Sequence, residues 1–540
     1  MRSRLLALGL TTSLALIGLA PVAASAAPDE TGPADGAAVT ARAAARAGAV
    51  LTEAKQLFVD EASPADPTPE AAPEDRDATL VLRDLARRRD DLPTAAQRRT
   101  AARLLARPTN GTDIQGVDEP KYAAGAPVGD ACDSHLCVHW VEQDTDGHDD
   151  SVSDDGDVQT VPAQVTRTLR TMQAVYAKEV GAMGYKAPLS DAAARTNGGD
   201  GRVDVYLADI GEQSLYGYCA NDEARMTTRR VFAYCVLDND YSPDEFGTDN
   251  TPIQNLQVTA AHEFFHAIQF AYDWNEDRWF MEGTAAWMED EVYDSVNDNR
   301  QYFSQSQLRF PGTSLDFTDG DYQPYGAWVF WRFLSEWSGP GRSDDPTVIR
   351  RTWTLAQGAR YSTAALAATL RERGSSFTAA YGVFGSWIRA PRTYFSEGTA
   401  YPAAPLSATR TLTAGSPGTG TLFRRTNHMA HTYVRFVPGA SLRTGRLRVS
   451  ANLPDLARGS VARVLIHRTD GRVVARAIRL ARNGNGSRVV DFRRSAVRYV
   501  DLDLGNASTR FVCGSFSLLT CGGIPRDDGL RVGYAATAIR

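Results

Sequence analysis

The pentapeptide His262-Glu263-Phe264-Phe265-His266 constrains this chain of 540 residues more than any other feature. Residues four apart lie on one face of an α-helix, so His262 and His266 can reach a single metal ion. Glu263 lies one step around the helix, where its carboxylate can contact a metal-bound water without binding the metal. With only 8 histidines in the chain, chance seldom produces such a run. The motif therefore predicts two ligands of a zinc site.

The helix that carries the motif is predicted to begin after Thr251 and to run to about Asp273. Thr251 is a suitable N-cap, Pro252 suits the first helical position, and Gln254 completes a capping box. An alternative without a metal is a buried polar cluster of two histidines and a glutamate. Such a cluster needs compensating partners, and a metal ion is the commonest of these.

A catalytic zinc site needs a third protein ligand and one open coordination position. The metzincin pattern would place Gly at position 269 and His or Asp at position 272, but the chain has Gln269 and Tyr272. The other pattern places a glutamate on a second helix that folds back on the first, and Glu282 fits it at the head of a helical run. Glu282 could instead be a first-turn glutamate stabilised only by the helix dipole. The rival ligands are Asp273, Glu276 and Glu289.

The second segment matches a W-x-x-E-G-x-A motif at Trp279, Glu282, Gly283 and Ala285. Together with the H-E-x-x-H run, this segment resembles the gluzincin metallopeptidases. Glu289 falls where relatives such as the aminopeptidase N group also carry an acid. The spacing from His266 to Glu282 differs slightly from that group, so the resemblance implies no peptidase specificity.

Further runs point to a second resemblance, and they are residues 132–139, 216–219, 234–241, the HEFFH helix and 279–294. In these runs the chain is similar to a family of bacterial secreted metalloproteases. The similarity covers most of residues 116–400 and, more loosely, the β-rich tail. It implies the reaction class and names no substrate.

The chemistry of such a site gives each residue a role. Zinc held by the two histidines and Glu282 would polarise a scissile carbonyl and lower the pKa of its bound water to about 7. Glu263 would act first as general base and then as general acid. Related gluzincins stabilise the oxyanion with a Tyr or His from a later helix, so Tyr322 or Tyr325 is the candidate donor. A tyrosine that merely caps the next helix is the alternative.

These observations predict a secreted zinc metallopeptidase, an endopeptidase whose partner is a protein or peptide substrate. One alternative is a zinc-bearing, non-proteolytic protein whose C-terminal β-sandwich binds a surface glycan or protein. Another is a metal-dependent hydrolase that acts on something other than peptides. Glu263 weighs against a pure binding protein, because such a protein needs no general base.

The N-terminus has the pattern of a signal peptide over residues 1–26. Arg2 and Arg4 precede an apolar run over 5–19, and residues 24–26 offer an A-x-A cleavage site. No later stretch approaches about 20 apolar residues, so we expect no membrane anchor. The net charge of -7 argues against a nucleic-acid partner. We expect a monomeric extracellular protein.

Six cysteines in an exported chain predict disulfides. They form three close pairs along the sequence: Cys132 with Cys137, Cys219 with Cys235, and Cys513 with Cys521. The alternative for the first pair is a zinc knuckle that also uses His135 and His139. Export exposes thiols to oxidation, and the spacing is not a standard zinc pattern, so the disulfide is favoured.

Composition divides the mature chain into three predicted parts, with an α+β fold overall. Residues 27–115 are rich in Ala, Arg, Asp and Pro, with helical periodicity over 38–60 and 77–107 and little to bury, which suits a helical pro-region or a spacer. Residues 116–400 are aromatic-rich and suit a zincin-like metalloprotease domain. Residues 405–540 alternate as short strands, which suits a β-sandwich.

The pattern also predicts individual elements. Strands are expected at 138–142, 201–210 and 230–237, and helices at 325–337, 346–357 and within 362–390. In the β-rich tail, strands are expected at 432–436, 447–449, 461–467, 473–480, 488–492 and 497–504. His428 and His431 are expected to lie on the surface of this tail.

Two acidic loops suggest calcium as a second cofactor besides zinc. Asp144 and Asp146 belong to one Asp-rich loop, and Asp200 and Asp204 to an Asp/Gly turn. Oxygen-rich turns suit Ca²⁺, although neither loop has the EF-hand pattern. Ordinary solvated acidic loops are the alternative.

Overall fold

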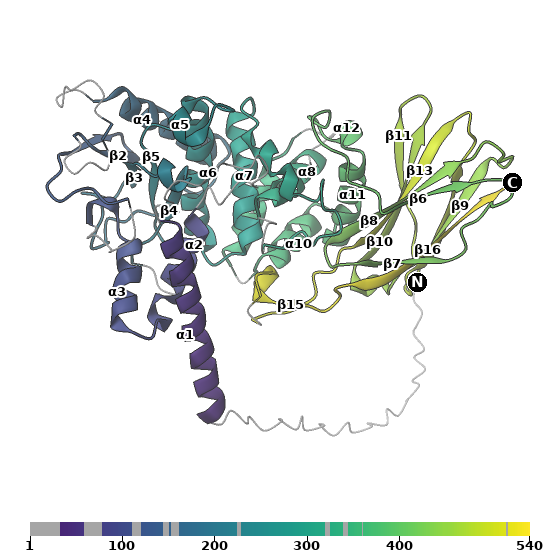
Figure 1. Ribbon diagram of the computed structural model, residues 1–540, viewed down its shortest axis with the longest axis horizontal. Coiled ribbons are helices and arrows are strands. Elements are labelled where there is room, and N and C mark those ends of the chain that lie inside the picture. Colours follow the sequence, from purple (N-terminus) through teal and green to yellow (C-terminus); the bar gives the residue numbers. More distant parts are fainter. Residues whose placement is uncertain are drawn as a thin grey trace, which may run out of the picture.

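The computed structural model shows a mixed α+β protein with N-terminal helices, a helical central region around one sheet, and C-terminal β-sheets (Figure 1). The residues that the structure describes are 33–58, 78–110, 120–143, 151–152, 161–223, 228–318, 324–338, 344–358, 360–514 and 517–540. The predicted signal peptide lies outside them. Within these ranges no helix combines the length and apolar character needed to cross a membrane.

The central sheet has five strands in the order β1-β2-β3-β5-β4. The three inner strands run parallel, and β1 and β4 pair antiparallel at the two edges. The strands predicted near 138–142, 201–210 and 230–237 are confirmed as β2, β3 and β5. The bounds are β1 Val128–Cys132, β2 Leu136–Val141, β3 Val203–Ala208, β4 Gly217–Ala220 and β5 Tyr234–Asp238.

The H-E-x-x-H motif lies in α6 (Pro252–Asp273), which contacts α4 (Ala163–Tyr176), β4 and β5. The helix begins with the predicted capping box, in which Gln254 Oε1 accepts a hydrogen bond from the backbone N–H of Thr251 at 2.9 Å. Its residues from 258 to 273 are all buried. After a short turn, α7 (Arg278–Tyr293) folds back against α6.

Aromatic side chains hold α7 against the later helices. Trp279 stacks on Trp331 with ring centroids 5.6 Å apart, and Phe280 meets Trp353 at 5.2 Å. A Cβ atom at Gly283 would lie 2.8 Å from Trp331 Nε1, so glycine permits the close approach. The later helices are α8 Trp328–Ser338, α9 Thr347–Ala356, α10 Thr363–Glu372, α11 Phe377–Arg389 and α12 Pro391–Tyr394.

The helices predicted at 325–337, 346–357 and within 362–390 are present, and the last of these ranges holds two. α10 and α11 are separated near Gly374, which takes a left-handed φ of 74°. Short helical turns complete the set: η1 Arg89–Asp91, η2 Pro108–Asn110, η3 Ala177–Ala182, η4 Gly211–Gln213, α5 Pro243–Phe246, η5 Asp298–Gln305, η6 Pro324–Ala327, η8 Leu456–Arg458 and η9 Thr520–Gly522.

The N-terminal helices are α1 (Pro33–Gln56), α2 (Thr79–Arg88) and α3 (Ala95–Leu104). The sequence predicted helices here with little to bury, but α2 belongs to the same hydrophobic core as the central sheet. Leu82 and Leu85 are fully buried, and α2 contacts β4. The Ala- and Arg-rich composition hid this packing, because few apolar residues suffice when all lie on one helix face.

The C-terminal region consists of two sheets that enclose a separate hydrophobic core. One sheet has the order β11-β10-β13-β8-β6 and the other β12-β9-β16-β7. The six predicted strands are confirmed, whereas β6, β7 and β16 were not predicted, because arginines, small residues and Gly interrupt their alternation. The bounds are β6 Ala408–Leu412, β7 Leu422–Thr426, β8 Ala430–Pro438, β9 Arg446–Asn452, β10 Ser460–Arg468, β11 Val473–Ala477, β12 Asn485–Asp491, β13 Val497–Asn506 and β16 Leu530–Ile539, with the small pair β14 Phe511–Val512 and β15 Ile524–Pro525.

The prediction that His428 and His431 lie on the surface is wrong. Their exposed fractions are 2% and 1%. His431 lies in β8 and His428 two residues before it, and β8 packs against the helical central region, where Tyr433 donates to the Gly385 carbonyl of α11. His428 Nε2 lies 2.8 Å from Asp316 of the central region, and His431 stacks on Tyr381 of α11. The alternation of apolar residues along a strand shows which face of the sheet meets its own core. It does not show that the opposite face is covered by the helical central region.

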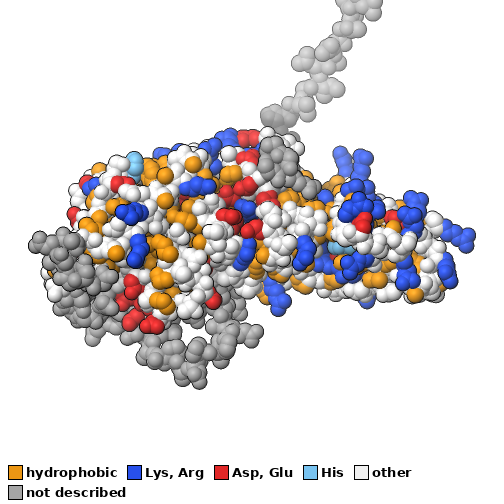
Figure 2. Space-filling view, turned by 90° about the horizontal axis from the view of Figure 1, so that it is seen from above, with side chains coloured by type: hydrophobic (Ala, Val, Ile, Leu, Met, Phe, Trp, Pro, Cys, Tyr) orange, Lys and Arg blue, Asp and Glu red, His pale blue; other side chains and the backbone are white. Residues whose placement is uncertain are grey.

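The three predicted disulfides are confirmed: Cys132–Cys137, Cys219–Cys235 and Cys513–Cys521. They are consistent with an extracellular protein. Charge is unevenly distributed, since Lys and Arg side chains gather over the C-terminal sheets in the view of Figure 2. Residues 405–540 contain 22 arginines against 7 aspartates, so the net acidity of the chain resides in the remainder.

Candidate metal centre

His262 and His266 bring their imidazole rings together one helical turn apart on α6, with ring centroids separated by 4.8 Å. Glu282 of α7 faces both rings, and its Oε2 lies 3.2 Å from His262 Nε2 and 3.4 Å from His266 Nε2. One ligand atom from each residue lies within 4.8 Å of the other two. The three predicted ligands therefore form a buried group that could hold a metal ion.

The second nitrogen of each imidazole has its own partner. His262 Nδ1 lies 2.6 Å from Glu289 Oε1, and His266 Nδ1 lies 2.8 Å from Gln269 Oε1. Gln269 is oriented in turn, because its Nε2 donates to the Met281 carbonyl at 2.9 Å. Acceptors on both Nδ1 atoms favour the tautomer whose Nε2 lone pair points at the metal position. Glu289 and Gln269 thus support the ligands.

The donor set fits a divalent cation on electrostatic grounds. Glu282 Oε1 is buried without a hydrogen-bond partner, which is costly unless a cation or proton compensates it. Glu179, on the π-helical turn η3, is fully buried, and burial raises its pKa well above the ordinary value, against the influence of His262. Glu263 and Glu289 add two more buried carboxyl groups. A cation would offset this accumulation of acids around two imidazoles.

Glu263 lies beside the histidines with 2% of its side chain exposed. Its Oε2 accepts a hydrogen bond from Thr79 Oγ1 at 3.0 Å. The same Thr79 hydroxyl accepts a hydrogen bond from the backbone N–H of Cys219 at 2.8 Å. Sequence reasoning missed Thr79, since it lies 184 residues from Glu263 and a single threonine forms no motif.

Tyr325 lies in η6 next to the centre. Its ring centroid is 5.9 Å from that of His262, and it stacks on Tyr302 at 4.9 Å. Both tyrosines line a cavity that His262, Glu263 and Tyr216 also line. The structure therefore brings Tyr325 to the site, whereas Tyr322 lies outside the described residues. Its role as an oxyanion donor stays a prediction.

Of the three rival ligands, Glu289 lies beside His262 at Nδ1 and is not part of the group on the Nε2 side, and the other two have partners of their own. Asp273 forms an ion pair with Arg229. Glu276 accepts hydrogen bonds from the backbone N–H groups of Ser362 at 3.0 Å and Asp277 at 2.9 Å. Neither acid belongs to the group formed with the two histidines, so Glu282 is the acid that completes it.

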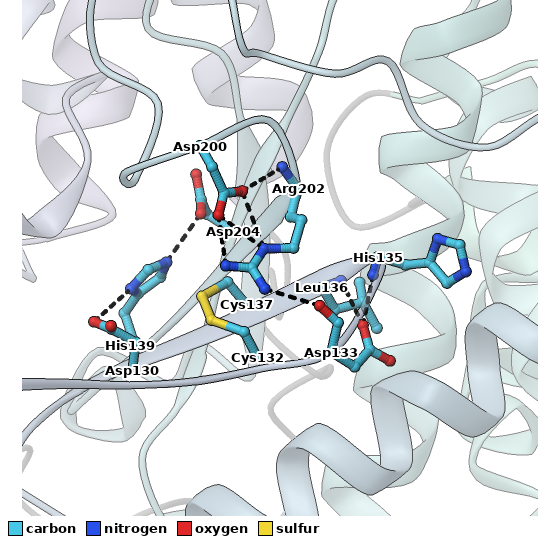
Figure 3. The surroundings of a disulfide bond; sticks show 10 residues. All are labelled: Asp130, Cys132, Asp133, His135, Leu136, Cys137, His139, Asp200, Arg202 and Asp204. Carbon is cyan, nitrogen blue, oxygen red and sulfur yellow. Dashed lines mark hydrogen bonds and ion pairs between the residues drawn. A yellow bond between two sulfur atoms is a disulfide. The ribbon is translucent and has the colours of Figure 1, made fainter.

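Figure 3 shows the surroundings of the first disulfide, where the zinc-knuckle alternative was considered. Cys132 and Cys137 are bonded to each other, so neither thiol is available to a metal. His135 stacks on Tyr176 at 4.3 Å, away from the bond, and His139 Nε2 lies 2.9 Å from Asp204 Oδ1. The disulfide prediction holds at this position.

The Asp/Gly turn predicted for calcium holds its two acids in ion pairs. Asp200 pairs with Arg202 at 2.5 Å, and Asp204 pairs with the fully buried Arg107 (Figure 3 shows the first pair). Asp144 and Asp146 lie outside the described residues. The calcium prediction therefore stays a prediction, without support from the turn.

A second group of metal-binding type does occur among the described residues, and it consists of Asp209, Asp238 and Glu245. Burial, together with the neighbouring acids, raises the pKa of Asp209 to about 8 and that of Asp238 to about 8. The backbone N–H of Tyr241 already donates to Asp238 Oδ1 at 2.5 Å. The group was not predicted, because its members come from three separate places: Asp209 follows β3, Asp238 ends β5, and Glu245 lies in α5.

No family model matches the sequence, and no curated protein matches it. Among solved structures, the chain is similar to a family GH115 4-O-methyl-alpha-glucuronidase, BtGH115A, described as specific for decorated arabinogalactans. The similarity covers 66% of this chain and 54% of that enzyme, with 12% sequence identity and a TM-score of 0.13. A likeness this slight carries no argument about fold or function.

Proposed function

We propose that this protein is a secreted zinc-dependent endopeptidase of the gluzincin type. The observation that carries the proposal is the convergence of two imidazole Nε2 atoms on Glu282, with Glu263 directly beside them. Two histidines and one carboxylate match the ligand set of zinc hydrolases, which leave a further coordination position open. Softer thiol ligands are absent from this group, and imidazole favours zinc over calcium or magnesium.

Zinc at this position would supply Lewis-acid polarisation of a substrate carbonyl and a lowered pKa for water. His262 and His266 would hold the ion through Nε2, with Glu289 and Gln269 fixing the ring orientations. Glu263 would accept the proton of the attacking water and deliver it to the leaving nitrogen. Tyr325 would donate its hydroxyl proton as a hydrogen bond to the developing oxyanion.

The sheet supports a peptide as the substrate. β4 is an edge strand of the described sheet, and it contacts the α6 helix that carries Glu263. Exposed strand edges bind extended peptides by adding a strand, with alternate backbone groups as partners. The cavity beside His262 is lined by Tyr216, Tyr302 and Tyr325, which suits an apolar or aromatic side chain.

The test is the variant Glu263→Gln in the full chain. We expect it to bind one equivalent of zinc, because Glu263 is not a ligand, and to lose hydrolysis of casein. Glu372→Gln, a glutamate exposed on α10, is the matched control and should retain both properties. Wild-type hydrolysis that survives removal of zinc by a chelator would contradict the proposal, as would full activity of Glu263→Gln.

A further inference from the structure

The N-terminal helix α2 contacts the proposed catalytic centre at Glu263. Thr79, at its first position, donates to Glu263 Oε2 at 3.0 Å. One turn later, Arg83 donates to the Glu276 carbonyl at 2.8 Å and contacts Met281 Sδ at 2.7 Å, at the start of α7. α2 therefore connects the general base on α6 with the helix that carries Glu282.

Thr79 also occupies the free edge of β4. Cys219 pairs with Cys235 of β5 on one side, and on the other side no strand among the described residues pairs with β4. The backbone N–H of Cys219 donates instead to Thr79 Oγ1 at 2.8 Å. Backbone N–H groups on a strand edge are the donors that an added peptide strand would use. A side-chain hydroxyl from α2 thus takes the place of a substrate carbonyl.

The burial of the centre is consistent with this arrangement. The side chains of His262, Glu263 and Glu282 are 5%, 2% and 2% exposed, whereas a site that cleaves peptides must admit an extended chain. Phe58, just after α1, is fully buried and packs against Tyr218 of β4 with ring centroids 6.0 Å apart. The N-terminal helices therefore cover the edge strand at more than one point.

We propose that α2 is an inhibitory segment that holds the peptidase latent by masking Glu263 and the substrate edge of β4. The proposal rests on the function proposed above and adds its regulation. Activation requires α2 to leave the site, after which Glu263 loses the Thr79 hydroxyl and Cys219 N–H is free to bind a substrate carbonyl.

The structure also indicates where the removable part ends. Arg107 is fully buried and pairs with Asp191 at 2.6 Å and with Asp204, so loss of Arg107 would leave buried carboxylates without a counter-ion. Residues 89–91, which form the turn η1 between α2 and α3, are partly buried or exposed. A cut there releases α1 and α2 and keeps Arg107 in place. The released piece contains no cysteine, so no disulfide retains it.

The first test compares variants of the full zinc-loaded chain. Thr79→Val keeps the side-chain shape but removes both hydrogen bonds, and we expect chelator-sensitive casein hydrolysis to rise about threefold to tenfold. Thr79→Ser restores the hydroxyl and should restore latency. The matched control is Thr100→Val on α3, whose hydroxyl bonds only within its own helix. A fall in activity in Thr79→Val would overturn the proposal, because it would make Thr79 a residue that assists Glu263.

The second test inserts a recognition sequence for a site-specific protease after Asp91 and removes the cut piece in dilute urea. Activity should rise about tenfold or more, and the same cut in a Glu263→Gln chain should yield none. Equal activity before and after release would overturn the inhibitory role and leave the peptidase proposal intact.

A readout without catalysis separates the two proposals. The rate at which a chelator removes zinc should increase about tenfold on release of α2, because the covered centre becomes accessible. If no form hydrolyses casein, the peptidase proposal fails, and a faster removal rate still supports the covering by α2. An unchanged removal rate overturns it.

Discussion

Buried histidines lie beside carboxylates both on α6 and at the junction between the central region and the C-terminal sheets, and of these two regions only the first brings them together as a metal site would. On α6 and α7, the Nε2 atoms of His262 and His266 converge on one carboxylate, Glu282. Separate acceptors bind each Nδ1 atom. The lone pairs of two neutral imidazoles can therefore meet at one point, which is the requirement of a metal site.

At the junction between the central region and the C-terminal sheets, the histidines are distributed differently. His428 lies between Asp316 and Asp528, and His431 faces Asp503. His428 and His431 share no carboxylate, so each imidazole has separate hydrogen-bond partners and the two do not converge on one point. Similar side chains thus form an ion-pair junction in one region and a metal centre in the other, and convergence distinguishes the two.

The largest expected effect concerns the residue on which the two histidines converge. Glu282→Gln should weaken zinc binding more than about 100-fold, because even supporting residues around a metal contribute 10- to 100-fold. Casein hydrolysis should fall with it. Asp316→Asn, at the junction, should leave zinc affinity unchanged. The zinc affinity of both variants is measured by competition with a chromogenic chelator. A reduced zinc affinity in Asp316→Asn would show that the two regions are coupled.

The contrast between the regions marks what sequence could predict. A local pattern arises when ligands lie four residues apart on one helix or on a second helix that follows closely. This pattern predicted His262, His266 and Glu282. For Glu289 the sequence offered a rival ligand and a position where related peptidases carry an acid, but no role. Its partnership with His262 depends on how α7 folds back.

Long-range packing left no such pattern. His428 meets Asp316 from 112 residues away, and Thr79 meets Glu263 from 184 residues away. Both contacts depend on how separate groups of elements pack. In the sequence, nothing around His428 or Thr79 distinguishes it from a surface residue. The strand order of the C-terminal sheets could not be predicted from the sequence for the same reason.

The next largest effect is expected from removing the hydroxyl of a tyrosine near a histidine, and each region has one such tyrosine. Tyr325→Phe should lower kcat about 100-fold with zinc content unchanged, as expected for loss of one oxyanion donor. Tyr381 stacks on His431 at 4.6 Å and donates to Gln307 Oε1 at 3.0 Å. Tyr381→Phe should leave kcat unchanged and reduce the free energy of unfolding by about 1 kcal/mol. The measurement is steady-state kinetics of both variants after α1 and α2 have been cut off and removed. A wild-type kcat in Tyr325→Phe would remove Tyr325 from the mechanism.

A smaller effect is expected where a carboxylate supports a ligand rather than binding the metal. Glu289→Gln keeps the side-chain size but weakens the partner of His262 Nδ1, so zinc affinity should fall about 10- to 100-fold. Asp503→Asn removes the corresponding partner of His431 and should not alter zinc affinity. Equal affinities in Glu289→Gln and wild type would mean that the orientation of His262 is fixed by packing alone.

The contribution of His428 at the junction to the free energy of unfolding should depend on pH. Burial opposes the charged form of His428, but hydrogen bonds with Asp316 and Asp528 outweigh burial and raise its pKa to about 9. Because this lies above the unfolded value of about 6.5, the stabilisation is fully present below about pH 6.5 and is lost as the pH rises through about 9. The shift corresponds to about 3 kcal/mol, and the exposure of Asp528 reduces the expected loss to about 2 kcal/mol.

The measurement is the free energy of unfolding of wild type and His428→Gln at about pH 6 and about pH 10. The variant lacks the titrating group, so the difference between the two proteins should shrink on going to the higher pH by about 2 kcal/mol. His135→Gln is the control, because His135 is exposed and stacks only on Tyr176 near the first disulfide. A pH-independent difference would show that His428 contributes to the junction as a neutral residue, and the contrast with the metal centre would then rest on geometry without charge.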